Sequence, residues 1–273
     1  MEVISGWQPW LTMGRCTKSG RMTRPDSRQA NDHRPIEIIP GFQRKAEGSV
    51  LFRAGGTVVL CTASIDPVVP GWMMGQGKGW LTAEYQMHPR ANARRESRDG
   101  RGKALSGRSM EIQRLIGRAL RAAIDLDALG ERTVAIDCDV LEADAGTRTA
   151  SVSAGFVALA LALSKLTNKG DLRKPVLRDQ IAAISVGHVR SEVLLDLCYE
   201  EDRVAGVDMN VVASATGEIV EVQATAEGRA VPRREIDTMI DVALAGIASV
   251  AQTQRRALES AKVDLASLFQ PKA

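Results

Sequence analysis

The chain of 273 residues has few of the residue types that usually build redox, metal or nucleophilic sites. It has four cysteines without a Cys-x-x-Cys pair, and three histidines without metal-ligand spacing or a serine–histidine–aspartate pattern. The sequence therefore argues against a disulfide framework, a zinc site and histidine catalysis, and we expect a reduced, cytoplasmic setting. These residues are Cys16, Cys61, Cys138, Cys198, His33, His88 and His188.

Long apolar runs and nucleotide-binding loops are also missing. The longest apolar run, Val152 to Leu163, is interrupted by Ser153 and Gly155, so it predicts a buried helix, and we expect no membrane partner. The glycine-rich stretch 71–79 contains neither GxxxxGKS/T nor a GxGxxG that opens a helix, which argues against a nucleotide-binding loop. With 44% hydrophobic and 25% charged residues, the composition is nevertheless that of a folded globular protein.

The first 22 residues differ from the rest of the chain. Trp7 and Trp10 lie there without any periodicity, and a short basic run follows them. No apolar segment followed by a small-residue cleavage site is present, which disfavours a secretory signal. We interpret residues 1–22 as a loose N-terminal extension, with Met22 as the natural beginning of the protein.

Periodic and alternating patterns predict an α+β fold. Apolar residues at spacings of three and four predict helices, and short apolar or alternating runs predict strands. Because strands followed by a helix occur twice, we expect one domain over 23–273 with two similar halves, about 23–170 and 171–273. The expected helices are 109–126, 151–166 and 233–262, and the expected strands are 36–39, 48–53, 57–64, 79–85, 133–140, 181–189, 193–199, 207–213 and 218–224.

Charge is unevenly distributed, although the formal net charge is only +3. Residues 90–118 contain nine basic and three acidic side chains, whereas residues 196–208 contain five acidic and one basic. The basic region suits phosphates and the acidic region suits a divalent cation. The arginine-rich part of the basic region, 89–103, is typical both of a solvated loop and of a nucleic-acid-binding arm.

The stretch Ala145–Thr149 joins an expected strand to an expected helix and has the features of an anion site. Gly146 allows the backbone to approach a ligand, and the first amides of the helix carry the positive end of its dipole. Thr147 and Thr149 add hydroxyl groups, and Arg148 adds a planar group that can hold a phosphate by two hydrogen bonds. An ordinary capped helix start has the same pattern, so this stretch alone leaves both interpretations open.

Two aspartates in the acidic region, Asp202 and Asp208, are candidate ligands for Mg²⁺, which prefers oxygen ligands and retains several waters. In one straight strand they would lie about 20 Å apart at ~3.3 Å per residue. They share a site only if the chain folds back at Gly206. The alternative is a solvated acidic turn at Asp202 and a structural role for Asp208.

Seven stretches of the chain together resemble ribonuclease PH, a family of phosphate-dependent 3′ exoribonucleases that trim tRNA precursors. They occur in order from Arg24 to the last expected helix, which makes the resemblance highly specific. They are Arg24-Pro25-Asp26, Ala46-Glu47-Gly48-Ser49-Val50, Leu60-Cys61-Thr62-Ala63-Ser64, Gly75-Gln76-Gly77-Lys78-Gly79-Trp80, Glu111-Ile112-Gln113-Arg114-Leu115-Ile116-Gly117-Arg118, Asp137-Cys138-Asp139-Val140 with Gly146-Thr147-Arg148-Thr149-Ala150, and Asp208-Met209-Asn210-Val211-Val212.

The resemblance implies a role for three groups of residues. One group would bind inorganic phosphate as the co-substrate, a second would form the acidic catalytic and Mg²⁺ site, and a third would hold the RNA away from the chemistry. The phosphate-binding group would be Arg108, Gly146, Thr147 and Arg148. The catalytic and Mg²⁺ group would be Asp202 and Asp208, and the RNA-holding group would be Arg90, Arg95 and Arg98.

The resemblance also implies a fold and an assembly. The fold would be a βα sandwich of the ribonuclease PH type (ribosomal protein S5 domain 2-like), with mixed sheets packed on central helices, and the assembly a homohexameric ring built as a trimer of dimers. The implied reaction is reversible removal of 3′-terminal nucleotides as nucleoside 5′-diphosphates. One rival function is that of a catalytically silent RNA-binding ring subunit of an exosome-like assembly. Another is that of a small-molecule kinase, but the glycine-rich ATP loop that such a kinase requires is missing from this sequence.

The chain departs from the family pattern at two positions near the proposed site. Ala145 and Ala224 stand where the family usually has glycine. Ala145 places a methyl group beside the expected phosphate site. Neither change removes a group that the chemistry requires.

Overall fold

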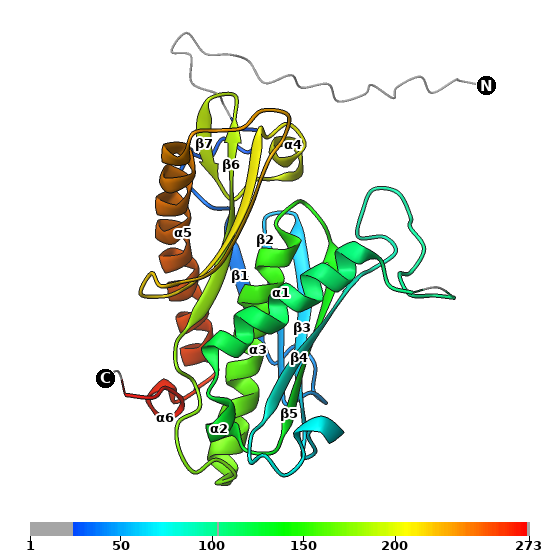
Figure 1. The fold of residues 1–273 in the computed structure, drawn as a ribbon, viewed down its shortest axis with the longest axis vertical. Coiled ribbons are helices and arrows are strands. Elements are labelled where there is room, and N and C mark those ends of the chain that lie inside the picture. Colours follow the sequence, from blue (N-terminus) through cyan, green and yellow to red (C-terminus); the bar gives the residue numbers. More distant parts are fainter. Residues whose placement is uncertain (1–23, 103, 272–273) are drawn as a thin grey trace, which may run out of the picture.

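The computed structural model describes residues 24–102 and 104–271, in which strands form two sheets that pack on long helices (Figure 1). The first sheet has the order β1-β2-β3-β5-β4 and the second β7-β6-β8-β9. The strands are β1 (Ile36–Pro40), β2 (Gly48–Ala54), β3 (Thr57–Asp66), β4 (Trp80–Met87), β5 (Thr133–Glu142), β6 (Ile181–Val189), β7 (Glu192–Leu195), β8 (Val207–Ser214) and β9 (Ile219–Ala226). The helices are α1 (Gly107–Ala123), α2 (Leu126–Leu129), α3 (Thr147–Lys169), α4 (Tyr199–Asp202), α5 (Arg233–Ser260) and α6 (Leu265–Leu268), with a short 3₁₀ helix at Gly71–Met73.

Helix α3 is the central element of the fold. It packs against β2 and β3 of the first sheet and against β6 of the second, so one apolar core joins both sheets. By length and composition α3 and α5 are both apolar enough to cross a membrane, but 89% of the apolar window of α3 is buried inside the fold. Its apolar character on all sides therefore follows from its position between two sheets.

The two sheets differ in strand direction. In the first, β4 pairs parallel with β5, and the other neighbours pair antiparallel, so this sheet is mixed. All pairs of the second sheet are antiparallel. The parallel pair is joined through α1, as parallel strands need a crossover connection. The crossover places the start of α1 close to the end of β5.

The α+β sandwich predicted from the sequence is confirmed, with three local corrections. Helix α3 begins at Thr147 rather than at residue 151, because Gly146 takes the left-handed conformation that precedes it. Segment 193–199 was predicted to be one strand, but β7 ends at Leu195 and α4 begins at Tyr199, because Glu201 caps that turn through the Cys198 amide. Helix α1 begins at Gly107 rather than at residue 109, because Ser106 caps it by accepting from the Ser109 amide. The interpretation of residues 1–22 lies outside the described residues, as does Lys103.

Candidate active site

The turn between β5 and α3 has an unusual backbone conformation. Ala145 and Gly146 have φ of 56° and 64°, in the left-handed region that favours glycine. The turn is held by Thr57, whose hydroxyl donates to the Ala145 carbonyl at 2.6 Å and accepts from the Asp144 amide at 3.0 Å. Helix α3 therefore begins abruptly at Thr147, next to the end of the first sheet.

The start of α3 offers free donors. Gly146 caps α3 without a side chain. Among the described residues, no acceptor takes the amides of Thr147, Arg148 or Thr149. The Thr149 hydroxyl donates to the Gly146 carbonyl at 2.9 Å, and the Thr147 hydroxyl pairs with Tyr85 at 2.8 Å. The two threonines thus shape the helix start, and its amides remain available for an anion.

Two arginines lie at this helix start. Arg148 is in the first turn of α3, and its Nη1 donates to Gln223 at 2.9 Å and approaches Glu111 at 3.5 Å. Arg108 is in the first turn of α1 rather than just before it. In the described part of the chain, no side chain forms an ion pair or hydrogen bond with Arg108, so its five donors are available for a ligand.

The two aspartates predicted to share a site are brought together. Asp202 ends α4 and Asp208 is the second residue of β8. Between them the chain turns: the Ala205 amide donates to the Asp202 carbonyl at 3.2 Å, and the Gly206 amide donates to His188 at 2.8 Å. The chain therefore folds back between the two aspartates, as a shared site requires. Asp202 is exposed at the end of the acidic helix α4, so the solvated acidic turn of the alternative is present as well.

Both aspartates have raised pKa values. Partial removal from water is the main cause for each. The negative charge of Asp202 raises the pKa of Asp208 further, while Arg148 and Arg108 lower it. The same two arginines act on Asp202, which places all four side chains within electrostatic range of one another.

A pocket of about 510 Å³ lies between α1, α3 and the second sheet. Its charged and polar lining comprises Glu111, Arg148, Asp208, Asn210, Gln223 and Thr225. Gln223 donates to Glu111 at 2.9 Å while it accepts from Arg148, so the three side chains form one network across the two halves. Among the described residues, no group of three or more His, Cys, Asp or Glu side chains is arranged to hold a metal ion.

Sequence reasoning did not assign Glu111, Gln223 or Tyr85 to this site. Glu111 follows Arg108 by three residues on α1, a spacing that places both on the same helix face and that signals proximity. Gln223 and Tyr85 lie within strands and carry no such local signal. Their contacts with Arg148 and Thr147 are set by how α1, α3 and the sheets pack.

The arginines predicted to hold RNA lie on the loop between β4 and α1, which projects from the body of the molecule (Figure 1). Arg90, Arg95 and Arg98 are exposed, and none of them lines the pocket. Asp99 ties the loop to the start of α1 by accepting from the Ser109 hydroxyl at 2.7 Å and from the Ser106 hydroxyl at 2.7 Å. These bonds lower the pKa of Asp99 to about 2.

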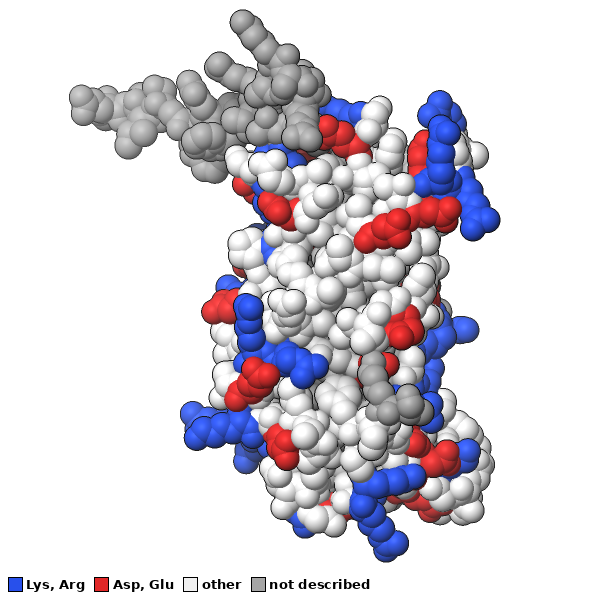
Figure 2. All heavy atoms as spheres, turned by 90° about the vertical axis from the view of Figure 1, so that its left-hand side faces the viewer, with Lys and Arg blue, Asp and Glu red and all other residues white. Residues whose placement is uncertain are grey.

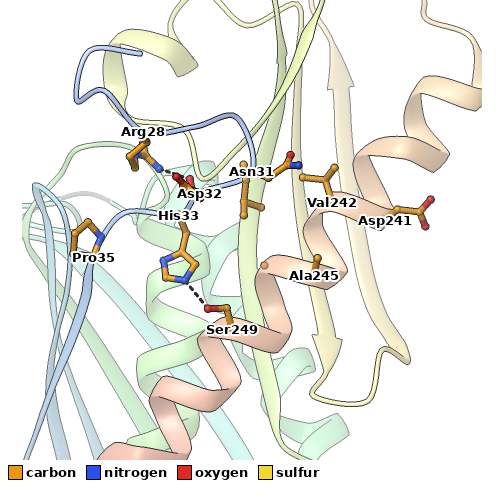
Figure 3. Close-up of a pocket in the computed structure, with 11 residues that line it drawn as sticks. Arg28, Asn31, Asp32, His33, Pro35, Asp241, Val242, Ala245 and Ser249 are labelled. Atoms are coloured by element: carbon orange, nitrogen blue, oxygen red, sulfur yellow. Dashed lines mark hydrogen bonds between the residues drawn. The ribbon is translucent and has the colours of Figure 1, made fainter. Parts of the chain in front are cut away.

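A second hollow, of about 660 Å³, lies between α5 and the segment before β1 (Figure 3). His33 points toward α5 there, and its Nε2 is 2.8 Å from the Ser249 hydroxyl. The hollow contains neither the arginine pair nor the aspartate pair. Of the residues predicted to do chemistry, Arg148 and Asp208 line the first pocket, and Gly146 lines a separate small cavity beside Arg34 and Asp196.

Comparisons with known proteins agree with this geometry. The chain matches the 3′ exoribonuclease family, domain 1, over residues 32–164 and domain 2 over residues 179–246. Ribonuclease PH of Crocosphaera subtropica (strain ATCC 51142 / BH68) is 51% identical over 238 residues, which are 87% of this chain and 98% of that protein.

Solved structures with lower identity share the fold. Rice (Oryza sativa) Rrp46 has a TM-score of 0.70 at 17% identity, and the match covers 86% of this chain and 100% of that one. A chain of the Archaeoglobus fulgidus exosome with RNA bound to the active site has a TM-score of 0.69 at 24% identity, and the match covers 84% of this chain and 91% of that one. With both family domains matched in order and half of the residues shared with a relative of nearly equal extent, the chain belongs to the 3′ exoribonuclease family.

Proposed function

We propose that this protein is a phosphorolytic 3′-to-5′ exoribonuclease, a tRNA nucleotidyltransferase that removes 3′-terminal nucleotides from tRNA precursors and other RNA 3′ ends. Inorganic phosphate is the co-substrate, the products are nucleoside 5′-diphosphates, and the reaction is reversible. One observation carries the proposal: in a chain of this family, an arginine pair at a free helix start acts electrostatically on an aspartate pair, and one member of each pair, Arg148 and Asp208, lines the same pocket.

The phosphate side of the reaction belongs to Arg108, Gly146, Thr147 and Arg148. The two guanidinium groups and the first amides of α3 neutralise and orient the phosphate, so that one of its oxygens can attack the terminal phosphodiester. The new P–O bond forms as the bond to the 3′ oxygen of the preceding nucleotide breaks. Little covalent work falls to the protein, because holding two anions in line is the main barrier.

Asp208 is the candidate acid for the departing 3′ oxygen. Its raised pKa increases the fraction of Asp208 that carries a proton, and this proton can pass to the leaving oxygen. Asp202 helps to create this property, because its negative charge raises the pKa of Asp208. The pair therefore has a chemical use beyond metal ligation.

Mg²⁺ fits the same two carboxylates. The negative charge of Asp202 raises the pKa of Asp208, so the pair has negative charge for a cation to neutralise, and the Asn210 amide lies 3.5 Å from Asp208. Mg²⁺ needs only one or two carboxylates because waters and substrate phosphates complete its shell. Bound by Asp202 and Asp208, it would neutralise charge on the scissile phosphate.

The RNA beyond the last nucleotides would lie along the loop that carries Arg90, Arg95 and Arg98. These side chains are exposed and, among the described residues, have no acidic ion-pair partner, which leaves their charge for backbone phosphates. None of the three arginines lines the pocket, which suits holding substrate rather than reacting with it.

Self-association into a homohexameric ring, a trimer of dimers, is part of the proposal. The α5 side of the molecule has a broad uncharged centre (Figure 2), and only 33% of the apolar window of α5 is buried in the single chain. Trp72 and Met74 are each 64% exposed on another surface. Apolar area of this kind is typical of contacts between subunits.

A reduced, cytoplasmic setting fits the cysteines. In the described part of the chain all three cysteines are free and buried, namely Cys61, Cys138 and Cys198. A cytoplasmic enzyme keeps such thiols reduced.

The experiment that tests the function is digestion of a tRNA precursor with an unpaired 3′ tail in the presence of Mg²⁺, with and without inorganic phosphate. We expect shortening and nucleoside diphosphates only when phosphate is present. Shortening without phosphate, with monophosphate products, would show a hydrolase and contradict the phosphate site. Binding without shortening would favour the silent ring subunit.

A further inference from the structure

A buried ion pair lies directly behind the candidate active site. Arg34 and Asp196 are 3% and 6% exposed and make two parallel hydrogen bonds, Nε–Oδ2 of 2.9 Å and Nη2–Oδ1 of 2.7 Å. Burial alone would raise the pKa of Asp196, but the hydrogen bonds and charge of Arg34 outweigh it and lower that pKa. Both groups are therefore charged and fixed.

Arg34 extends this pair to the phosphate-binding turn. Its Nη1 donates to the Asp144 carbonyl and lies 3.4 Å from the Asp144 Oδ2 atom. The turn between β2 and β3 leaves room for both residues: a Cβ on Gly55 would lie 2.5 Å from Arg34, and one on Gly56 would lie 2.9 Å from Asp144. Asp144 immediately precedes Ala145 and Gly146, so Arg34 holds the start of the turn in place.

Asp144 also reaches the acidic half of the site. Its Oδ1 atom accepts from the Tyr199 amide at 2.9 Å. Tyr199 is the first residue of α4 and Asp202 is the last. Through one short helix, Asp144 therefore connects the turn before Arg148 to the turn between Asp202 and Asp208.

The elements joined by Asp144 are otherwise firmly anchored. Glu201 of α4 accepts from buried Arg24 at 2.7 and 2.8 Å. The segment that carries Arg34 is attached to α5 by His33 and Ser249 (Figure 3). Arg24 also joins these two regions, because it donates to the Asp196 carbonyl at 3.0 Å as well as to Glu201. The Asp144 carboxylate is the contact between them that lies next to the turn before Arg148.

We propose that Asp144 is a positioning residue that sets the spacing between the phosphate-binding turn and the Asp202–Asp208 pair, with Arg34 holding it in place. The inference rests on the proposed function. Its consequence is catalytic because the phosphate and the scissile bond must be held in line, and a displacement of about 1 Å costs up to ~10²-fold in rate. Neither Asp144 nor Arg34 needs to touch the substrate.

The test compares Asp144→Ala with Asp144→Asn in steady-state phosphorolysis, with phosphate and Mg²⁺ varied separately. Asparagine keeps an oxygen that can accept from the Tyr199 amide, whereas alanine does not. We expect Asp144→Ala to lower kcat/KM for phosphate by about tenfold or more, and Asp144→Asn to restore it to within about threefold of wild type. Asp264→Ala is the matched control: Asp264 accepts from a backbone amide at the start of α6, far from the site, and its loss should leave the kinetics unchanged.

Two kinetic outcomes overturn the proposal. Wild-type kinetics in Asp144→Ala would show that the contact of Asp144 with the Tyr199 amide does not set the geometry of the site. Equal loss in Asp144→Ala and Asp144→Asn would show that only the charge beside Arg34 matters and that the contact with Tyr199 does not position the site.

Hydrogen exchange of the Tyr199 amide tests the same contact without any turnover. We expect faster exchange in Asp144→Ala and near wild-type exchange in Asp144→Asn. Unchanged exchange in Asp144→Ala would refute the link directly. If the exchange responds while the wild-type protein shows no phosphorolysis, the proposed function fails and the structural link stands, so the two failures are distinguishable.

Discussion

Arg148 uses one side of its guanidinium group for the protein and leaves the other for a ligand. Nη1 is taken by Gln223 and Glu111, while among the described residues no acceptor takes the Nε and Nη2 donors. Contact with the protein thus orients the side chain before phosphate arrives. Pre-orientation lowers the entropy that binding must remove, as expected of a group that stabilises developing charge.

We predict that Arg148→Ala lowers kcat/KM for phosphate by about 10²-fold, since removing one charge-stabilising donor costs ~2.7–4 kcal/mol. Steady-state assays with varied phosphate measure this, with Arg173→Ala as a control at an exposed arginine outside the pocket. If Arg148→Ala keeps its activity within about threefold, a deficit below ~0.7 kcal/mol, the phosphate role of Arg148 is wrong.

We predict that the Asp208 carboxylate lowers the stability of the fold while it is needed for phosphorolysis. Its folded-state pKa lies above the ordinary value, so its ionisation destabilises the fold as pH rises through that pKa, and the penalty is absent at lower pH. Asp208→Asn removes the charge, so we expect a melting temperature higher than wild type at pH 7 and near loss of phosphorolysis. Thermal unfolding at pH 7 and at pH 3, without divalent ions, measures this. A gain that is equal at both pH values would contradict the assigned cause.

Ala145 lies in a left-handed conformation that costs a non-glycine residue about 1–2 kcal/mol. We predict that Ala145→Gly raises the free energy of unfolding by up to ~1 kcal/mol, the remainder being offset by the greater flexibility of unfolded glycine. Ala122→Gly is a control with the same substitution at an exposed position in α1. There we expect the opposite effect, a stability lowered by about 0.5–1 kcal/mol. Denaturant unfolding measures both, and equal destabilisation by the two changes would exclude strain at Ala145.

At the scale of elements, Asp99 connects the basic loop to the helix that carries Arg108. The carboxylate holds Ser106 and Ser109 at the start of α1, so the position of the loop is tied to that of Arg108 and the proposed phosphate site. The pKa of Asp99 of about 2 keeps it ionised at any working pH. Its contribution is present above the ordinary pKa of 3.8 and is lost as pH falls through about 2.

We predict that Asp99→Ala raises KM for a tRNA precursor by about threefold or more, because the loop arginines that we propose to contact the RNA backbone are no longer held in place. KM for a trinucleotide, too short to reach the loop, should hardly change. Both values come from phosphorolysis at fixed phosphate and fixed salt between pH 6 and 8. Equal changes for long and short substrates would place the effect of Asp99 at the pocket instead.

At the scale of the whole molecule, the uncharged α5 side is the expected contact between copies of the chain (Figure 2). Ala248 is exposed on α5, so a charge there leaves the fold intact but must be buried in an assembly. We predict that Ala248→Arg shifts the protein from the proposed hexamer toward smaller species in sedimentation velocity at micromolar concentration. An unchanged hexamer would place the contact on another surface, such as that of Trp72 and Met74.

Local patterns were enough to predict most of the fold. Helices α1, α3 and α5 follow from apolar spacing, and eight of the nine strands lie close to their predicted segments, because amphipathic periodicity directly reflects burial. The error at 193–199 has a local cause. Its apolar residues continue the strand pattern, but the capping contact of Glu201 with the Cys198 amide and its ion pair with Arg24 turn the chain into α4.

The sequence by itself determined the three long helices, eight of the nine strands, the glycine turn before Arg148 and the family pattern, because these depend on neighbours in the chain. Only the tertiary structure decided that Asp202 and Asp208 meet, that Gln223 orients Arg148, and that Asp144 links the two sides of the site. These contacts join residues up to 75 positions apart in the chain. Their formation depends on how α3 packs between the two sheets, a long-range burial of apolar surface that no local pattern encodes.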